Sequence, residues 1–502
     1  MKRIAILQRK IAFFNIFRWF LLSLFIGAIV GIFNAMFLKL LEFSIGVTNR
    51  FEYYFLILPF ALYAVSKLAA ISPKDNDYST NQAIASINER KGVSLISAVK
   101  AFFLPIITIA CGGSAGKESP CADVGAGVAS TITRLFSFNK QERRKLMICG
   151  VSAGFAGVFG VPISGALFGL EVLSVGTVFY EVMFPAFIAG ITSFQVTHAL
   201  GVNYIYHPLQ LQAISLDGSL FQVVLAGIFF GIVALILIET IKLTGILMRY
   251  VSSKTNLFVR CLLASSVVIL IGLLTSPDYL GLTMNRIDII LSGGKGANLG
   301  FLVKIVATAF TFAGGGVGGL VTPVFFIGAN SGYFFANLIG LSTSTFAALG
   351  VVSVLAGAAN TPLAASIMAI ELFGASIAPY AAVSCIVSFL VTGRRSIYPK
   401  QEFSFDKNLI EDDSENTHNA YTTEQLEKVL VQKNFILSSV KHLIPNNLSK
   451  KEVKKIVKKA KKDKINIEIL KHLLPDFEDG NNNGQTKEEP KNKEPENEEP
   501  KK

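Results

Sequence analysis

Charged side chains are scarce in this sequence of 502 residues. Asp, Glu, Lys and Arg make up only 16% of it, whereas about a quarter is usual for a soluble globular domain. The deficit is concentrated between Arg18 and Thr392, where long apolar runs such as Leu21–Leu41 and Leu220–Ile238 recur. A bilayer crossing needs roughly 20 mostly apolar residues. The composition therefore excludes a soluble domain over this stretch and predicts a multi-pass integral membrane protein.

Catalytic and redox motifs are also lacking. The sequence contains no HExxH, no paired catalytic carboxylates and no metal-ligand cluster. Gly150–Gly154 spells G-x-S-x-G around Ser152, but no strand precedes it and no His or Asp partner is evident in matching context, so close helix packing is the preferred interpretation and a hydrolase a remote hypothesis. Gly112–Lys117 is one residue short of a phosphate loop, and Glu118 replaces the required Ser or Thr. We expect no enzymatic activity, no metal and no cofactor.

The cysteines argue against both disulfides and metal binding. All five lie inside apolar stretches and show no pairing pattern, which is typical of small apolar side chains. They are Cys111, Cys121, Cys149, Cys261 and Cys385.

Positive charge, by contrast, is present and unevenly placed. The net charge is +12, and the basic groups stand before the first apolar run, near mid-chain and after the last run. They are Lys2, Arg3, Arg9, Lys10 and Arg18; Arg249, Lys254 and Arg260; and Arg394 onward. The positive-inside rule predicts that both termini and the mid-chain loop are cytoplasmic, in the plasma or inner membrane. No basic soluble domain precedes the tail, so no nucleic-acid partner is expected.

Composition divides the chain into four parts. Residues 1–19 are predicted to form a basic interfacial helix. Residues 20–217 and 218–400 are predicted as two membrane repeats. Residues 401–502 form a polar cytoplasmic tail that is expected to be disordered after about residue 479, where Gly, Asn, Lys, Glu and Pro dominate.

An internal repeat supports the division of the membrane part. Blocks 112–126 and 315–329 carry glycines and prolines in the same order, at a constant offset of 203. Blocks 150–171 and 350–371 follow at an offset of 200, and each ends on a glutamate. An odd number of crossings in each half would invert the halves and place a substrate site near the membrane midplane, at the repeat interface.

The motif Gly116–Pro120 is the sharpest chemical signal. A glycine-rich backbone precedes a proline in the first helical turn, which favours a helix start. Free N–H groups and the positive dipole end of that helix would bind an anion. Because Gly319–Pro323 repeats the pattern, two helix N-termini are expected to converge on one anion without a buried full positive charge. A site without such a charge holds the anion weakly enough to release it during transport.

Glu118 stands where a negative charge would compete with that anion. An intramembrane carboxylate is a functional candidate, and a carboxylate that is ionised in the site and protonated out of it would act as a gate. The alternative is a structural carboxylate at a helix N-terminus. Val321 at the equivalent position shows that the fold does not require a carboxylate there, which favours the gate.

Together these motifs resemble the CLC family of chloride channels and proton/chloride exchangers. Gly116–Pro120 is similar to the family's GREGP-type motif, with Lys for Arg and Ser for the second Gly. Gly319–Pro323 is similar to its GxFxP-type motif, with Val321 for Phe. Tyr398 matches its pathway tyrosine at the start of the final helix. The resemblance covers roughly residues 18–400.

The resemblance implies an all-α fold of two inverted repeats with broken and tilted helices, and a homodimer with one pathway in each subunit. It implies that Glu118 is the external gate, that the N–H groups of Leu320 and Val321 bind the anion, and that the Tyr398 hydroxyl lines the site. The full predicted anion-binding set is Gly116, Lys117, Glu118, Tyr78, Ser79, Leu320, Val321 and Tyr398, with chloride as the transported ligand.

Two departures leave the transport mode open. Tyr78 takes the place of the family's anion-coordinating serine, and either its hydroxyl or that of Ser79 could serve. Val172 stands where many exchangers of the family carry an inner proton-transfer glutamate. Channels of the family also have an apolar residue at this position. The sequence therefore predicts voltage-gated chloride channel conduction gated by Glu118, with a proton-coupled exchanger of chloride or another halide, such as fluoride, as the alternative.

Three further carboxylates are given other roles. Glu171 and Glu371 are matched between the repeats, so we expect them to hold helix ends by hydrogen bonds. Asp123 lies one turn beyond Glu118, where it could raise the pKa of the gate by like-charge repulsion or face an external vestibule.

Overall fold

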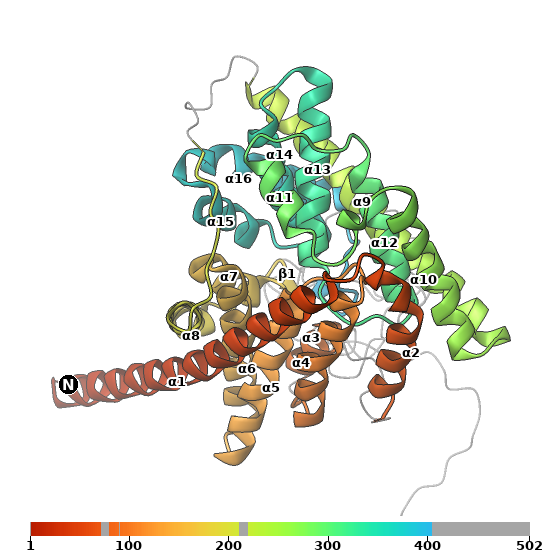
Figure 1. Cartoon of the computed structure of the whole chain (residues 1–502). Helices are drawn as coiled ribbons and strands as arrows, with labels where there is room; N and C mark the ends of the chain where they lie inside the picture. Colours follow the sequence, from red (N-terminus) through yellow and green to blue (C-terminus); the bar gives the residue numbers. More distant parts are fainter. Residues whose placement is uncertain (1, 72–79, 90, 210–218, 404–502) are drawn as a thin grey trace, which may run out of the picture. The chain divides into compact units, whose positions relative to one another are not determined.

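The computed structural model describes residues 2–71, 80–89, 91–209 and 219–403 (Figure 1). The polar tail beyond residue 403, with its predicted disorder after about residue 479, lies outside the described residues, as does the predicted repeat boundary at residue 217.

The described part is almost entirely helical. The first half contains α1 (Lys2–Thr48), η1 (Tyr54–Ile57), α2 (Leu58–Ala69), α3 (Thr80–Asn88), α4 (Leu95–Ala110), α5 (Glu118–Leu135), α6 (Lys140–Phe159), α7 (Pro162–Glu171) and α8 (Tyr180–Ala199). The second half contains α9 (Ser219–Lys254), α10 (Leu257–Leu274), η3 (Pro277–Tyr279), α11 (Met284–Leu291), α12 (Gly300–Ala313), α13 (Val321–Ile339), α14 (Thr343–Ala359), α15 (Pro362–Phe373), η4 (Ala375–Ile377) and α16 (Ala378–Thr392). A short parallel pair, β1 (Ser174–Val175) with β2 (Glu402–Phe403), joins the two halves.

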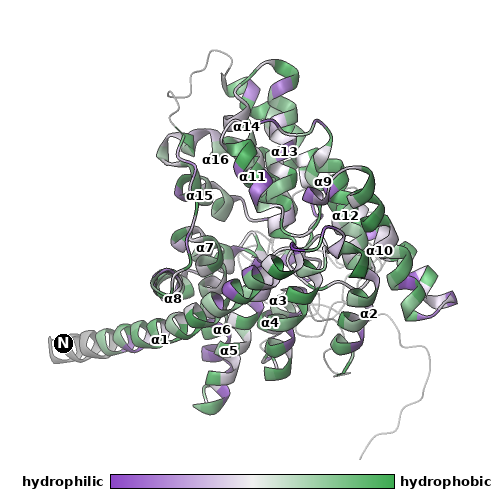
Figure 2. Cartoon of the chain, viewed as in Figure 1, coloured by the Kyte–Doolittle hydropathy of each residue, from purple (hydrophilic) through white to green (hydrophobic). Residues whose placement is uncertain are grey.

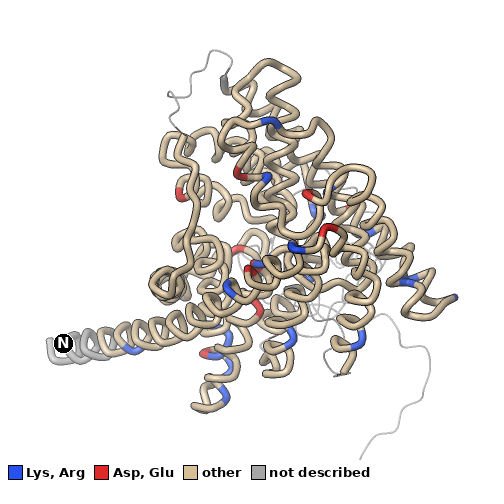
Figure 3. The backbone as a smooth tube through the Cα atoms, viewed as in Figure 1, with Lys and Arg blue, Asp and Glu red and all other residues tan. Residues whose placement is uncertain are grey.

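Helix lengths fit a membrane domain of whole and partial crossings. Among the described residues, five helices are long and apolar enough to span a bilayer, and five others are apolar but only 10–17 residues long. Hydrophobic residues occur along most of the length of the helices (Figure 2). Lys and Arg lie instead near the lower ends of α2, α4 and α6 (Figure 3). Large side chains such as Phe221 and Leu274 are more than two-thirds exposed, as lipid-facing residues must be.

Helix α1 joins the predicted lead-in to the first span without a break. Its 47 residues correspond to about 70 Å at 1.5 Å per residue, more than twice the roughly 30 Å of bilayer hydrocarbon. The predicted boundary at residue 19 is therefore not marked by a turn or a cap, and the interfacial position of residues 1–19 stays a prediction.

The predicted repeat is visible in helix packing. A Cβ atom built on Gly125 of α5 would lie 2.1 Å from the carbonyl oxygen of Gly150 in α6. The same atom on Gly328 of α13 would lie 2.3 Å from the carbonyl oxygen of Gly350 in α14. No side chain fits at either crossing, so the repeated glycines are needed for the close approach of these helix pairs.

Each of the two repeated glutamates caps the start of the helix that carries the other glutamate. Glu171, at the end of α7, accepts the N–H groups of Leu363 (3.1 Å) and Ala364 (2.8 Å) at the start of α15. Glu371, near the end of α15, accepts the N–H groups of Ile163 (2.9 Å) and Ser164 (2.8 Å) at the start of α7. This confirms the predicted structural role of the pair and ties the two repeats together.

Candidate anion-transport site

The glycine loops of the two repeats meet backbone to backbone. The Gly116 N–H donates to the Gly319 carbonyl (2.7 Å), and the Gly319 N–H donates to the Gly116 carbonyl (2.8 Å). Helices α5 and α13 begin two residues after these glycines. Their N-termini, with their unpaired N–H groups and positive dipole ends, are therefore fixed beside one another as the sequence predicted.

Two threonines fix these loops through exchanged hydrogen bonds. The Ser114 N–H donates to Thr311 Oγ1 (3.0 Å), and the Val317 N–H donates to Thr108 Oγ1 (3.2 Å). These pairs are equivalent at the repeat offset of 203, and both threonines are fully buried. Each repeat thus supplies the acceptor that the other repeat's loop needs.

Glu118 is the first residue of α5, and its carboxylate lies on the N-terminus of α13. Its Oε1 accepts the Val321 N–H (2.5 Å), and its Oε2 accepts the Thr322 hydroxyl (2.7 Å). The side chain is only 1% exposed. Charged acceptors are favoured at a helix N-terminus, and bonds to them are stronger than neutral ones. The carboxylate therefore occupies donors that an inorganic anion would use.

The flanking glycines make room for this carboxylate. A Cβ atom on Gly319 would lie 2.0 Å from Glu118 Oε1, and one on Gly116 would lie 2.4 Å from Oε2. Any side chain at either position would collide with the carboxylate or with an ion in its place. This steric requirement explains why both motifs have glycine at these positions.

Tyr398 lies beside the gate, as the resemblance implied. It is 2% exposed, its hydroxyl bonds the Ser119 side chain, and it lies within electrostatic reach of Glu118 and Asp123. The expected helix start at Tyr398 is wrong for the described residues, because the segment is irregular up to β2.

Hydrogen bonds to helix ends hold the Tyr398 segment in its irregular conformation. The Ile397 N–H donates to Ala358 O (2.9 Å). The Gln401 amide donates to Val172 O (2.9 Å) and Ala359 O (2.8 Å). The segment is therefore anchored to the ends of α7 and α14.

The other predicted site residues are partly accounted for. Lys117 and Leu320 are the equivalent N-cap residues of α5 and α13. Lys117 interacts electrostatically with Glu118 and lines a neighbouring cavity. Tyr78 and Ser79 lie outside the described residues.

Thr322 is a residue in contact with Glu118 that sequence reasoning missed. It is the counterpart of Ser119 at the repeat offset of 203, so both repeats place a hydroxyl directly after the gate position. The matching hydroxyls could have indicated from the sequence that this position matters. The structure gives the two hydroxyls different partners, since Thr322 bonds Glu118 and Ser119 bonds Tyr398.

Side chains outside the site agree with their predicted packing roles. Ser152 is fully buried and donates to the Ala166 carbonyl (3.1 Å), and a Cβ atom on Gly169 would lie 2.2 Å from its Oγ. This is close packing of α6 on α7. All five cysteines are free, and four are buried. Asp123, by contrast, was expected to influence Glu118 or to face a vestibule; it is 4% exposed within α5, so it does not face an open vestibule, and its effect on Glu118 stays a prediction.

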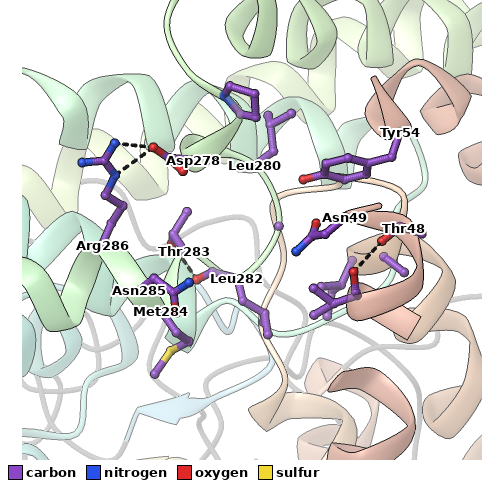
Figure 4. A pocket seen from close by; sticks show the side chains of 15 residues that line it. Thr48, Asn49, Tyr54, Asp278, Leu280, Leu282, Thr283, Met284, Asn285 and Arg286 are labelled. Atoms are coloured by element: carbon purple, nitrogen blue, oxygen red, sulfur yellow. Dashed lines mark hydrogen bonds and ion pairs between the residues drawn. The ribbon is translucent and has the colours of Figure 1, made fainter. Parts of the chain in front are cut away.

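A cavity among the described residues lies apart from the predicted site. It has a volume of about 390 Å³ and is lined by the end of α1, η1 and the segment from Pro277 to Arg286 (Figure 4). Asp278 accepts a hydrogen bond from Arg286 Nε (2.9 Å) at its edge. Partial burial acts to raise the pKa of Asp278, but bonds from Arg286 and Ser276 outweigh it and lower the pKa below its ordinary value. None of the predicted anion ligands that the structure describes lines this cavity.

An all-α membrane fold of two repeats, with paired helix N-termini around one buried carboxylate, defines a transport protein for small anions. A model of the family described as voltage gated chloride channel matches residues 57–393. The chain therefore belongs to this family, which is the CLC family that its motifs resemble.

Individual relatives agree with this assignment. A chloride/fluoride channel protein of Pseudomonas syringae pv. tomato is 34% identical over 412 residues, which cover 78% of this chain and 87% of the relative. A CLC-type fluoride/proton antiporter of known structure is 28% identical with a TM-score of 0.74, covering 78% of this chain and 99% of that one. A cyanobacterial Cl⁻/H⁺ antiporter, at 17% identity and a TM-score of 0.65, covers 75% of this chain and 94% of its own, and it shares the inverted-repeat fold.

Proposed function

We propose that this protein exchanges a halide, with fluoride as the first candidate, for protons across the membrane, and that Glu118 couples the two movements. The observation that carries the proposal is the position of the Glu118 carboxylate on Val321 N–H and Thr322 Oγ1. The similarity to a relative named for chloride and fluoride and to a fluoride/proton antiporter supports the choice of ion and mode.

The coupling follows from competition for one set of donors. An ionised carboxylate and a halide both need the N–H and O–H groups at the start of α13, and two negative charges cannot share them. A protonated carboxyl group is a weaker acceptor, so it leaves the site and the halide enters. Each exchange of places therefore requires a proton on Glu118. The proposed transport needs no cofactor, because the halide itself is the ligand.

A passive, voltage-gated chloride channel is the second candidate. It is favoured by Val172, which is fully buried at the end of α7 and occupies the position of the inner proton-transfer glutamate of many exchangers in the family. In a channel, Glu118 would gate the pathway without a fixed proton stoichiometry.

A flux assay in proteoliposomes separates the two candidates. The purified full chain is reconstituted with fluoride or chloride at equal concentrations on both sides, and a pH gradient is imposed with the voltage clamped at zero. An exchanger drives the halide uphill at the expense of protons, whereas a channel moves none. Glu118→Gln is expected to abolish this uphill movement while halide leak persists. Uphill movement that survives in Glu118→Gln would exclude Glu118 as the coupling residue.

We also propose that the protein is a homodimer in the plasma or inner membrane with both termini in the cytoplasm. Apolar side chains on α8 and α16 are exposed and could pack against lipid or a second copy. Among them Phe184, Ile386 and Leu390 are 46–56% exposed. Light scattering of the detergent-solubilised protein measures the mass, and a monomer mass would contradict the dimer.

A further inference from the structure

A second chamber lies next to the gate. It has a volume of about 240 Å³, and Lys117, the residue before Glu118, forms part of its wall together with Phe159 and Phe325. Residues 203–207, which follow α8, and one face of α11 close its other sides. Because Glu118 itself is 1% exposed, a proton from solution must pass through a compartment of this kind to reach it.

The chamber belongs to the outer face under the proposed orientation. Lys145 near the start of α6 bonds Glu181 at the start of α8 (2.8 Å), so these two helices begin on the basic, cytoplasmic side. Helix α8 has 20 residues, about 30 Å, and therefore ends on the opposite side. Residues 203–209 follow that end.

Three hydrogen bonds fix the segment that covers the chamber. Tyr204 donates to the Gly157 carbonyl (2.5 Å) and Tyr206 donates to the Gly160 carbonyl (2.8 Å), both at the end of α6. The His207 N–H donates to the Leu372 carbonyl (3.0 Å) at the end of α15. His207 is therefore held in one place while its ring faces the chamber.

The His207 ring is paired with a carboxylate across the chamber. Its Nε2 lies 3.2 Å from Oδ1 of Asp288 in α11, and the two side chains are 16% and 28% exposed. The other ionisable groups around them are Lys117 and Tyr204 in the chamber wall. Asp288 and Glu42 of α1 act electrostatically on Lys117, and Glu371 of α15 acts on Tyr206.

We propose that His207 is the outer proton-transfer residue for Glu118, and that Asp288 is the positioning residue that orients its ring. This rests on the proposed exchange of halide for protons. Imidazole carries two ring nitrogens that can each accept or donate a proton, so it can pass a proton from the outer solution into the chamber. The imidazolium N–H then gives that proton to water in the chamber, whose wall includes Lys117, the residue next to Glu118. The Glu118 side chain takes the proton from this water when it moves from the α13 N-terminus toward that wall, and the neutral ring is ready for the next proton.

The test measures halide transport against external pH while the internal pH is held constant. Variants His207→Gln and His207→Asn are compared with His198→Gln, a control at the end of α8 that does not line the chamber; its ring bonds the Val202 carbonyl and packs against Phe194 and Tyr204. We expect the His207 variants to lower the proton-coupled rate by about tenfold or more and to flatten its dependence on external pH. The halide-to-proton ratio stays unchanged because Glu118 is intact. Asp288→Asn is expected to give a smaller loss.

Chemical rescue distinguishes proton transfer from a structural role. Imidazole added outside is expected to restore transport in His207→Gly but not in Glu118→Gln. An unchanged pH profile in the His207 variants, or a uniform loss without rescue, overturns the assignment of His207. Neither result affects the proposed exchange, which fails if the wild-type protein moves no halide uphill in a pH gradient. If His207→Gln does not fold, His207→Asn supplies the same comparison.

Discussion

At the residue scale, the difference between Glu118 and Val321 decides what the paired helix N-termini hold. Both begin a helix after the same glycine loop, yet only one carries a carboxylate, and that carboxylate reaches across to the other helix. The fold therefore provides two equivalent helix N-termini beside one another, and under the proposed function the Glu118 carboxylate makes the occupancy of the anion site depend on protons.

Thr322 sets how firmly the ionised gate is held. Thr322→Val removes the hydroxyl that donates to Glu118 Oε2, and a buried bond to a charged group is worth about 1.5–3 kcal/mol. Losing it disfavours the ionised carboxylate, so half-maximal transport is expected at a pH higher by about 1–2 units. The measurement is halide efflux against pH. Thr322→Ser keeps the hydroxyl and should stay near the wild type; an equal shift in both variants would contradict this role.

Sequence reasoning reached Glu118 because the repeat isolates it, and the contacts of its neighbours needed the structure. The sequence does not show which side chain the Thr322 hydroxyl contacts. The hydrogen bonds between Gly116 and Gly319 bring the two helix starts together and place Glu118 next to Thr322. Tyr398 lies near Glu118, and its role stays a prediction; up to residue 403 its segment is not helical, because Gln401 anchors it on the ends of α7 and α14.

At the element scale, the exchanged caps of α7 and α15 should carry measurable stability. Glu371→Ala leaves the Ile163 and Ser164 N–H groups without their acceptor, at an expected cost of about 1–3 kcal/mol. Thermal unfolding in detergent measures it. Glu239→Ala, which breaks only the exposed ion pair with Arg395, should cost under about 1 kcal/mol. Equal losses in the two variants would argue against a capping role.

The close helix crossings give a second test at this scale. Gly328→Ala would place a methyl group 2.3 Å from the Gly350 carbonyl oxygen, and such overpacking typically costs about 1–3 kcal/mol. Gly245→Ala in α9 meets nothing within 4 Å and should be neutral or slightly stabilising because Ala favours helix. The two melting temperatures are compared in the same detergent; a Gly328→Ala protein as stable as the wild type would show that α13 and α14 can separate without loss.

At the scale of the whole molecule, the basic helix ends imply one orientation in the membrane. Gln141, beside the start of α6, is expected to face the cytoplasm, and Ser292, after α11, the outside; both are exposed. A membrane-impermeant maleimide should label Ser292→Cys in intact cells and leave Gln141→Cys unlabelled until the cells are opened. The reverse pattern would invert the proposed topology and place His207 inside.

The hydrogen bonds exchanged between Thr108, Val317, Ser114 and Thr311 also constrain how the protein is made. The loop of the first repeat leaves the ribosome about 200 residues before its acceptor, an interval of roughly 10–40 s at 5–20 residues per second. During that time its donors have no partner within the chain, and they lie in a segment bound for the membrane interior. The first repeat's loop must therefore wait, held by the insertion machinery or by water, until the second loop arrives, and the paired helix N-termini cannot form before both repeats are made.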